Sequence, residues 1–153
     1  MLISDLLSPE RICCDVKSSS KKRLLELISE ELARNSEELS KREIFESLCA
    51  RERLGSTGLG NGVAVPHAKA EGIAEAALVL GRSRQGIEWQ AIDGRPVHIV
   101  FLLVSKAGEA EQHLACLRWI STLARSADFR RFLLDAAGEA EMRELLVEMT
   151  PKK

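Results

Sequence analysis

Val97–Ser105 reads VHIVFLLVS, a nearly continuous apolar run. Because side chains alternate between the two faces of a strand, such a run predicts a central strand that is covered on both faces. Further segments with strand-like composition lie at 11–16, 63–65, 76–82 and 87–90. We therefore expect 97–105 at the centre of a sheet, with the strands between residues 76 and 105 as antiparallel neighbours.

Helical patterns lie before and after this block of strands in the sequence. Ser40 and Glu43 form an S-x-x-E capping box at the start of one helix. Apolar residues recur at helical spacing in segments at about 20–35, 40–53, 109–125, 128–136 and 139–148. The faces that we expect to be buried are Leu24, Leu25, Ile28 and Leu32 in the first helix and Ile44, Phe45, Leu48 and Cys49 in the second. In the third they are Leu114, Leu117, Ile120 and either Leu123 or Ala124. This order predicts a single-domain α/β sandwich over residues 1–153, a mixed parallel and antiparallel sheet of about five strands flanked by helices.

The composition excludes several classes of protein. With 45% hydrophobic and 29% charged residues and a formal net charge of −1, the chain matches an ordinary soluble domain. Its charges are interleaved, so it lacks the basic face that nucleic-acid binding needs. No apolar run approaches the roughly 18 residues of a membrane span, and the N-terminus has no signal-peptide pattern. We expect a cytoplasmic protein without membrane insertion.

The four cysteines, Cys13, Cys14, Cys49 and Cys116, form no C-x-x-C pair. Adjacent cysteines have poor geometry for a zinc site. We therefore expect small buried hydrophobic residues in a reducing compartment, with neither a metal nor a cofactor.

A glycine-rich loop precedes one predicted strand. Arg51–Lys69 reads RERLGSTGLGNGVAVPHAK, with four glycines within eight residues. A P-loop would need a lysine after its last glycine, where this chain has Asn61-Gly62. A dinucleotide-binding motif would need a strand before the glycines and a helix after them, and here the order is reversed. Neither nucleotide-binding pattern fits.

The loop instead resembles an anion site beside a histidine. Backbone N–H groups around Ser56, Thr57 and Gly58 are candidate phosphate donors, and the Arg51 guanidinium suits phosphate. Pro66 cannot donate to a sheet ladder, so we expect the strand to end there and to present His67 at its end. A neutral imidazole has a lone pair that can attack phosphorus. These residues predict a phosphohistidine site with His67 as the acceptor.

The other two histidines differ in context. His98 alternates within the central strand, and we expect it to make a structural hydrogen bond. His113 lies in the first turns of the helix after that strand, at a sheet edge that His67 could share. It is either a second active-site histidine, which would stabilise transferred charge, or a solvated residue at a helix start. Spacing alone leaves both readings open.

The segment 51–69, together with EQHLACL at 111–117 and the opening LISDLLSPERI, resembles the EIIA domains of the fructose/mannitol class of the sugar phosphotransferase system. It is most similar to their free-standing nitrogen-regulatory relatives (PtsN, or EIIA-Ntr). The resemblance implies an α/β sandwich, with His67 as phosphoacceptor, Arg51 as the phosphate-contacting arginine and His113 as the second active-site histidine. One departure is Ala68, where the family often has glycine.

The resemblance also implies partners. The phosphate donor would be a small histidine phosphocarrier, HPr or its nitrogen-branch equivalent NPr. The chain would then regulate targets such as potassium-transport proteins or sensor kinases by phosphorylation-dependent binding, as a phosphotransferase component rather than a small-molecule enzyme. Two alternatives stay open: a sugar-uptake EIIA that passes phosphate to a separate EIIB cysteine, and an interaction module that is never phosphorylated.

Overall fold

The central strand of the computed structural model is β5 (Val97–Lys106), as the apolar run predicts. The structure describes residues 16–17, 20–34, 40–70 and 76–149, and the strand expected at 11–16 lies almost entirely outside them. Within this part of the chain, β5 pairs with β4 (Ala77–Ile87) on one side and with β2 (Val63–Ala64) and β3 (His67–Ala70) on the other. The short β1 (Gly58–Gly60) extends the sheet next to β2.

β2 and β3 form one interrupted strand along the same edge of β5. Both are parallel to β5 and keep the same register, with Val63 opposite Ile99 and His67 opposite Leu103. The backbone ladder continues across the break, because the Leu103 N–H donates to the Pro66 carbonyl. The strand does pause at the proline, as expected, but it resumes directly after it. His67 therefore begins a strand instead of ending one.

β4 corrects a second expectation. It is antiparallel to β5, as predicted, but residues 77–82 and Ile87 belong to one strand, and residues 88–90 of the second expected segment lie beyond its end. The pairing with β5 is irregular between Arg82 and Ile87, and Gly86 has a φ of 86°. Gly86 thus accommodates a bulge inside the strand and not a turn between two strands. His98 stabilises this bulge, since its Nδ1–H donates to the Ser83 carbonyl at 2.9 Å.

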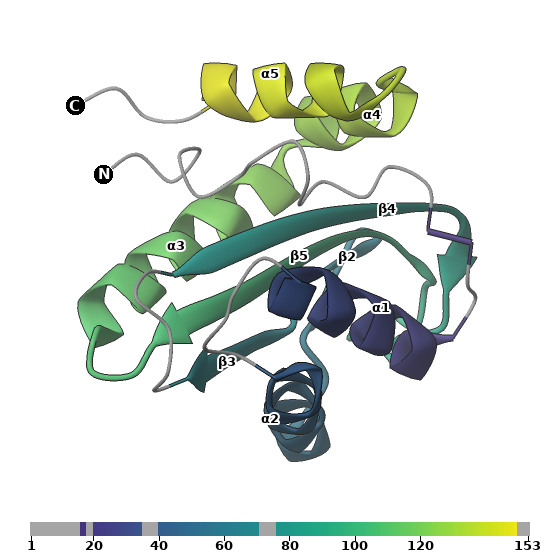
Figure 1. Cartoon of the computed structure of the whole chain (residues 1–153). Coiled ribbons are helices and arrows are strands. Elements are labelled where there is room, and N and C mark those ends of the chain that lie inside the picture. Colours follow the sequence, from purple (N-terminus) through teal and green to yellow (C-terminus); the bar gives the residue numbers. More distant parts are fainter. Residues whose placement is uncertain (1–15, 18–19, 35–39, 71–75, 150–153) are drawn as a thin grey trace.

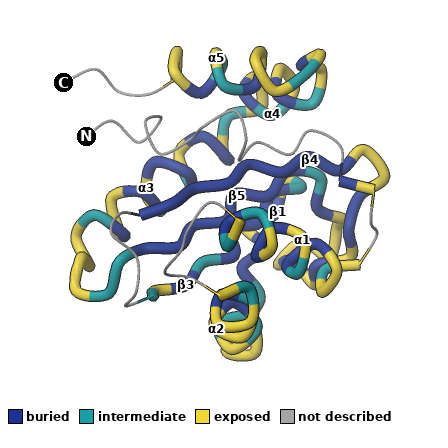
Figure 2. The backbone as a smooth tube through the Cα atoms, viewed as in Figure 1, coloured by how far each residue is buried: buried dark blue, intermediate teal, exposed yellow. Residues whose placement is uncertain are grey.

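Helices cover both faces of the sheet (Figure 1). On one face, α1 (Lys21–Arg34) and α2 (Lys41–Leu54) pack on alternate residues of the strands, including Ala64, Ala68 and Val100. On the other, α3 (Ala110–Arg125), α4 (Ala127–Asp135) and α5 (Glu139–Met149) pack on the residues between them. Figure 2 shows β4 and β5 buried along most of their length and the outer side of α2 exposed. The predicted α/β sandwich with a mixed sheet is confirmed.

The buried face of α3 differs from the expected one. Ile120 and Leu123 are buried as predicted, but Leu114 is 49% exposed. His113 and Cys116 occupy the inner positions instead. The helix is rotated relative to the expected stripe because His113 turns toward β5. Among the described helices, none is long and apolar enough to cross a membrane.

Gly58 allows the glycine loop to pack closely on the segment after β4. A Cβ at Gly58 would lie 2.6 Å from the Cβ of Ala91 and 2.8 Å from its Cα, which is closer than carbon atoms approach one another. Only a residue without a side chain allows this approach.

We expect Gly58→Ala to lower the free energy of unfolding by about 1–3 kcal/mol, because the backbone at Ala91 must move. Gly138→Ala is the control, since nothing lies within 4 Å of a Cβ at that position. Urea denaturation of both variants measures the difference. Equal stability of the two proteins would contradict the close packing of residues 58 and 91.

Candidate active site

His67 lies at the sheet edge formed by β3. Its ring is held by its own backbone, because Nδ1–H donates to the Val65 carbonyl at 2.8 Å. A carbonyl only accepts, so the proton is on Nδ1 and the lone pair of the neutral ring is on Nε2. The side chain is only partly buried. The nitrogen that is free to react is therefore Nε2.

Arg51 belongs to α2, which packs on the face of the sheet opposite to the His67 side chain. Its guanidinium reaches Nε2 of His67. Its Nε donates to His67 Nε2 at 3.3 Å, and its Nη1 donates to the Gly55 carbonyl at 2.9 Å. The guanidinium is planar, so these two contacts fix its orientation. A permanent positive charge thus lies beside the free nitrogen of His67.

His113 approaches from α3. The centroids of the His67 and His113 rings are 5.3 Å apart, and the ring planes are tilted by 56°. His113 is 6% exposed, and its Nδ1 lies 2.5 Å from the hydroxyl oxygen of Ser105 at the end of β5. The structure therefore brings together Arg51, His67 and His113 from α2, β3 and α3.

Both imidazoles are less basic than usual. Burial is the main cause of a lowered His67 pKa, and the Arg51 charge acts in the same direction, against the hydrogen bond to Val65. Burial, with the nearby His67 and Lys69, lowers the pKa of His113 from 6.5 to about 4. At neutral pH both rings are therefore neutral, and the site has a lone pair available.

The loop donors predicted from the sequence have other partners. The Thr57 N–H donates to Glu52 at 3.2 Å, and the Gly58 N–H donates to the Ser56 hydroxyl oxygen at 3.1 Å. The Ser56 hydroxyl in turn donates to the Trp89 carbonyl at 3.1 Å. In the free protein these groups therefore have partners within the chain, and the phosphate-binding role of Ser56, Thr57 and Gly58 stays a prediction.

Other residues at the site carry little signal in the sequence. The Val65 carbonyl orients His67 and Ser105 holds His113, yet a backbone carbonyl and a serine inside a strand have no motif of their own. Glu52, between Arg51 and Arg53, reads as an ordinary helix-surface acid. Ala68, next to His67, points to the other face of the sheet and packs in the core below α2, where it is 8% exposed.

The described residues contain no group of three or more His, Cys, Asp or Glu side chains that could hold a metal ion. Cys116 is buried in the core, as expected for a small hydrophobic residue, and Cys49 is partly buried. The chemistry that this arrangement supports is nucleophilic attack by a neutral imidazole beside a fixed cation.

Comparison with known proteins agrees with this geometry. Residues 5–149 match the family described as "Phosphoenolpyruvate-dependent sugar phosphotransferase system, EIIA 2". The chain is 35% identical over 147 residues to the nitrogen regulatory protein of Pseudomonas aeruginosa, with 96% of each chain covered. It is 32% identical over 139 residues to the fructose-specific EIIABC component of Bacillus subtilis, covering 91% of this chain but 22% of that much longer protein.

Among solved structures, the nitrogen regulatory protein IIA-Ntr of Neisseria meningitidis superposes with a TM-score of 0.86 at 37% identity. The match covers 94% of this chain and 98% of that one. Together, the matched residues, the relatives and the fold show that the chain belongs to the EIIA 2 family of the phosphoenolpyruvate-dependent sugar phosphotransferase system.

Proposed function

We propose that this protein is a phosphohistidine carrier that accepts a phosphoryl group on Nε2 of His67. One observation carries the proposal: the Val65 carbonyl holds the proton of His67 on Nδ1, and this turns the Nε2 lone pair toward Arg51. The lone pair forms a new N–P bond while the donor's bond to phosphorus breaks. The electron pair of the broken bond returns to the donor.

The Val65 carbonyl has a second role in this scheme. After transfer, the His67 ring carries phosphorus on Nε2 and a proton on Nδ1, and it is therefore positively charged. The carbonyl oxygen that accepts the Nδ1–H stabilises this charge. The same hydrogen bond thus selects the nucleophilic nitrogen before transfer and stabilises the phosphorylated ring afterwards.

Arg51 and His113 would bind the phosphoryl oxygens. In the free protein the Arg51 Nε donates to His67 Nε2, and on transfer it would donate to a phosphoryl oxygen instead. In this scheme the Ser105 hydroxyl donates to His113 Nδ1, 2.5 Å away, and His113 would carry its own proton on Nε2 as a neutral donor. The protein would supply position and charge stabilisation, which is most of what phosphoryl transfer requires.

The family and the similarity to nitrogen regulatory proteins favour a histidine phosphocarrier of the HPr or NPr type as donor, and a regulatory output. Leu54 at the end of α2 and Leu114 beside His113 are 85% and 49% exposed. Phosphorylation would add about two negative charges near these apolar side chains. Such a change would alter which target proteins dock there, including the potassium-transport proteins or sensor kinases implied by the resemblance.

A sugar-uptake role is the second candidate. The similarity to the fructose-specific EIIABC component of Bacillus subtilis favours it. The chemistry at His67 would be the same, and only the recipient would differ, being a cysteine of an EIIB domain. Transfer of phosphate from the labelled protein to a purified fructose- or mannitol-type EIIB separates this role from the regulatory one.

Incubation with phosphoenolpyruvate, Enzyme I and the histidine phosphocarrier should add one acid-labile phosphate to the wild-type protein. His67→Gln should take up none, because the nucleophile is gone. His98→Gln is the matched control and should be labelled like wild type, since His98 contacts the Ser83 carbonyl and not the site. Full labelling of His67→Gln would refute His67 as the acceptor. No labelling of wild type would refute the proposal and favour an unphosphorylated interaction module.

The protein should lose stability on acidification because His113 is held neutral. Between pH 6.5 and about 4, the unfolded chain binds a proton on this residue that the folded chain does not bind. The free energy of unfolding should therefore fall as the pH falls through this window, by about 2–3 kcal/mol from His113 alone. Urea denaturation between pH 7.5 and 4.5 should show a smaller loss in His113→Gln. An identical slope for both proteins would contradict the buried, neutral state of His113.

Leu54→Ser should raise the KM for the phosphocarrier about threefold to tenfold with little change in kcat, because an exposed apolar contact is lost from docking and not from chemistry. Val147→Ser is the control, since Val147 is 50% exposed on the distant α5. Steady-state transfer kinetics measure both. An equal effect of the two substitutions would argue against a docking role of the surface around Leu54.

A further inference from the structure

The Glu52 carboxylate lies at the centre of a buried polar cluster below the loop that follows α2. Its side chain is 8% exposed and lies 2.7 Å from the Lys21 ammonium at the start of α1. It also accepts the N–H of Thr57 at 3.2 Å and the Thr57 hydroxyl. Burying a carboxylate costs free energy unless it is paired and hydrogen-bonded, and this one has three donors.

Trp89 closes the cluster from the segment after β4. Its indole N–H donates to the Thr57 hydroxyl oxygen at 3.3 Å, and the Lys21 ammonium lies 5.0 Å from the centroid of its rings. Lys21 also donates to the Trp89 carbonyl at 3.4 Å. The Thr57 hydroxyl therefore donates to Glu52 and accepts from Trp89. These contacts fix the position of Thr57 relative to α1 and α2.

The fixed loop determines where Arg51 can lie. Gly55 stands between the end of α2 and Thr57, and its N–H donates to the Glu52 carbonyl at 3.2 Å. Glu52 thus holds this turn twice, through its main chain at Gly55 and through its side chain at Thr57. The Gly55 carbonyl in turn receives the Arg51 Nη1, and that contact aims the Arg51 Nε at His67.

We propose that Glu52 is a positioning residue: by tethering Thr57, it holds the Gly55 carbonyl where it directs the Arg51 guanidinium onto His67 Nε2. Glu52 would contact neither the phosphate nor the imidazole. The effect on phosphoryl transfer rests on the proposed function, whereas the effect on the free imidazole does not.

The proposal predicts coupling between Glu52 and Arg51. Glu52→Gln keeps the size of the side chain but removes the charge that pairs with Lys21, so the loop is held less firmly. Misplacement of a positioning group by about 1 Å can cost up to 100-fold in rate. If Glu52 acts through Arg51, its loss should have no further effect once Arg51 is absent. If the two residues act independently, the transfer rate of the double variant would instead fall by the product of the two single effects.

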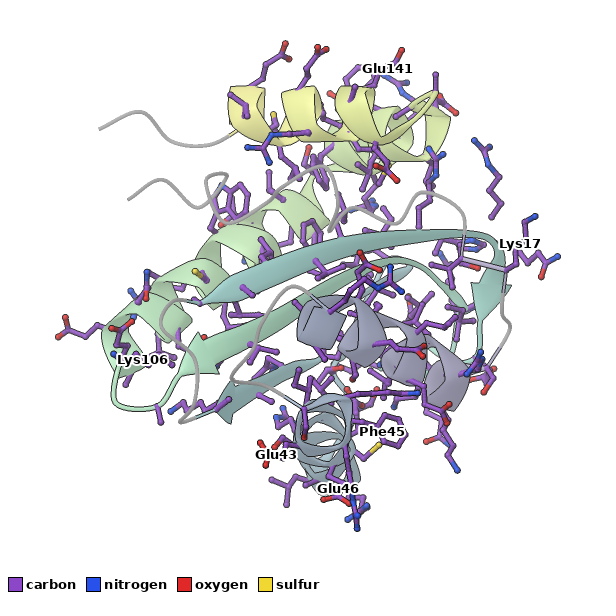
Figure 3. The ribbon with its side chains drawn as sticks, in the orientation of Figure 1. Lys17, Glu43, Phe45, Glu46, Lys106 and Glu141 are labelled. Atoms are coloured by element: carbon purple, nitrogen blue, oxygen red, sulfur yellow. The ribbon has the colours of Figure 1, made fainter. Side chains whose placement is uncertain are left out.

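The test is a double-mutant cycle on phosphoryl transfer from the histidine phosphocarrier, measured with folded protein. We expect Glu52→Gln to lower the transfer rate about tenfold and Arg51→Ala about 100-fold, with the double variant equal to Arg51→Ala. Glu46→Gln is the matched control. It is the same substitution on the same helix, and Figure 3 shows Glu46 on the outer side of α2, where it pairs with Arg42 at 3.0 Å.

The nitrogen resonance of His67 Nε2 provides a readout that needs no phosphorylation. The Arg51 Nε–H hydrogen bond shifts this resonance, and we expect the shift to be lost in Glu52→Gln and kept in Glu46→Gln. If wild type is not phosphorylated, the proposed function fails while this measurement still tests the positioning role. Thr57→Val removes the hydroxyl that links Glu52 to Trp89 and keeps the Thr57 N–H that donates to Glu52. It replaces Glu52→Gln if that variant does not fold. Thr57→Val should lower the transfer rate about threefold. It should shift the His67 Nε2 resonance in the same direction as Glu52→Gln does.

Two results would overturn the proposal. One is a double variant whose rate falls by the product of the two single effects, which would show that Glu52 acts apart from Arg51. The other is an unchanged His67 Nε2 resonance in both Glu52→Gln and Thr57→Val, which would show that the cluster does not control the Arg51 contact.

Discussion

The site depends on the hydrogen bond from His67 Nδ1 to the Val65 carbonyl. This acceptor is available because the edge strand pauses at Val65 and Pro66 before it resumes at His67 in the same register. Since proline has no N–H, the pause costs no ladder donor at that position. The Pro66 carbonyl still accepts from Leu103, so β3 stays tied to the centre of the sheet. A short break in an otherwise regular strand thus fixes both the position and the tautomer of the histidine.

The electrostatics of the site follow from neutral rings placed beside fixed cations. Burial and the nearby positive charges keep His67 and His113 unprotonated near neutral pH. The Arg51 guanidinium beside them keeps its charge. In the free protein, this cation lowers the pKa of His67. In the proposed transfer, the same cation would face a doubly negative group. The charge that makes the free imidazole less basic would therefore stabilise the phosphoryl group on it.

Much of the fold was predictable because its strongest patterns are long. The run at 97–105 identified the central strand, and helical spacing identified all five described helices. β1 and β3 were not predicted, because three- and four-residue strands with glycine, alanine and lysine have no clear period. The predicted buried face of α3 was also wrong at Leu114. Hydrophobicity alone does not show that His113 takes a buried position by hydrogen bonding to Ser105.

For the site, residue types were easier to predict than hydrogen-bond partners. The sequence indicated that Arg51, His67 and His113 could meet, and the structure brings them together. The sequence also indicated donors at Ser56, Thr57 and Gly58. It did not indicate that the Ser56 hydroxyl would donate to Trp89 and the Thr57 N–H to Glu52. Partners far apart in the chain are set by tertiary packing, and Glu52 acquires its contacts only when α1, α2 and the segment after β4 come together. In the free protein, the donors predicted for phosphate belong to the contacts that, in our proposal, position Arg51.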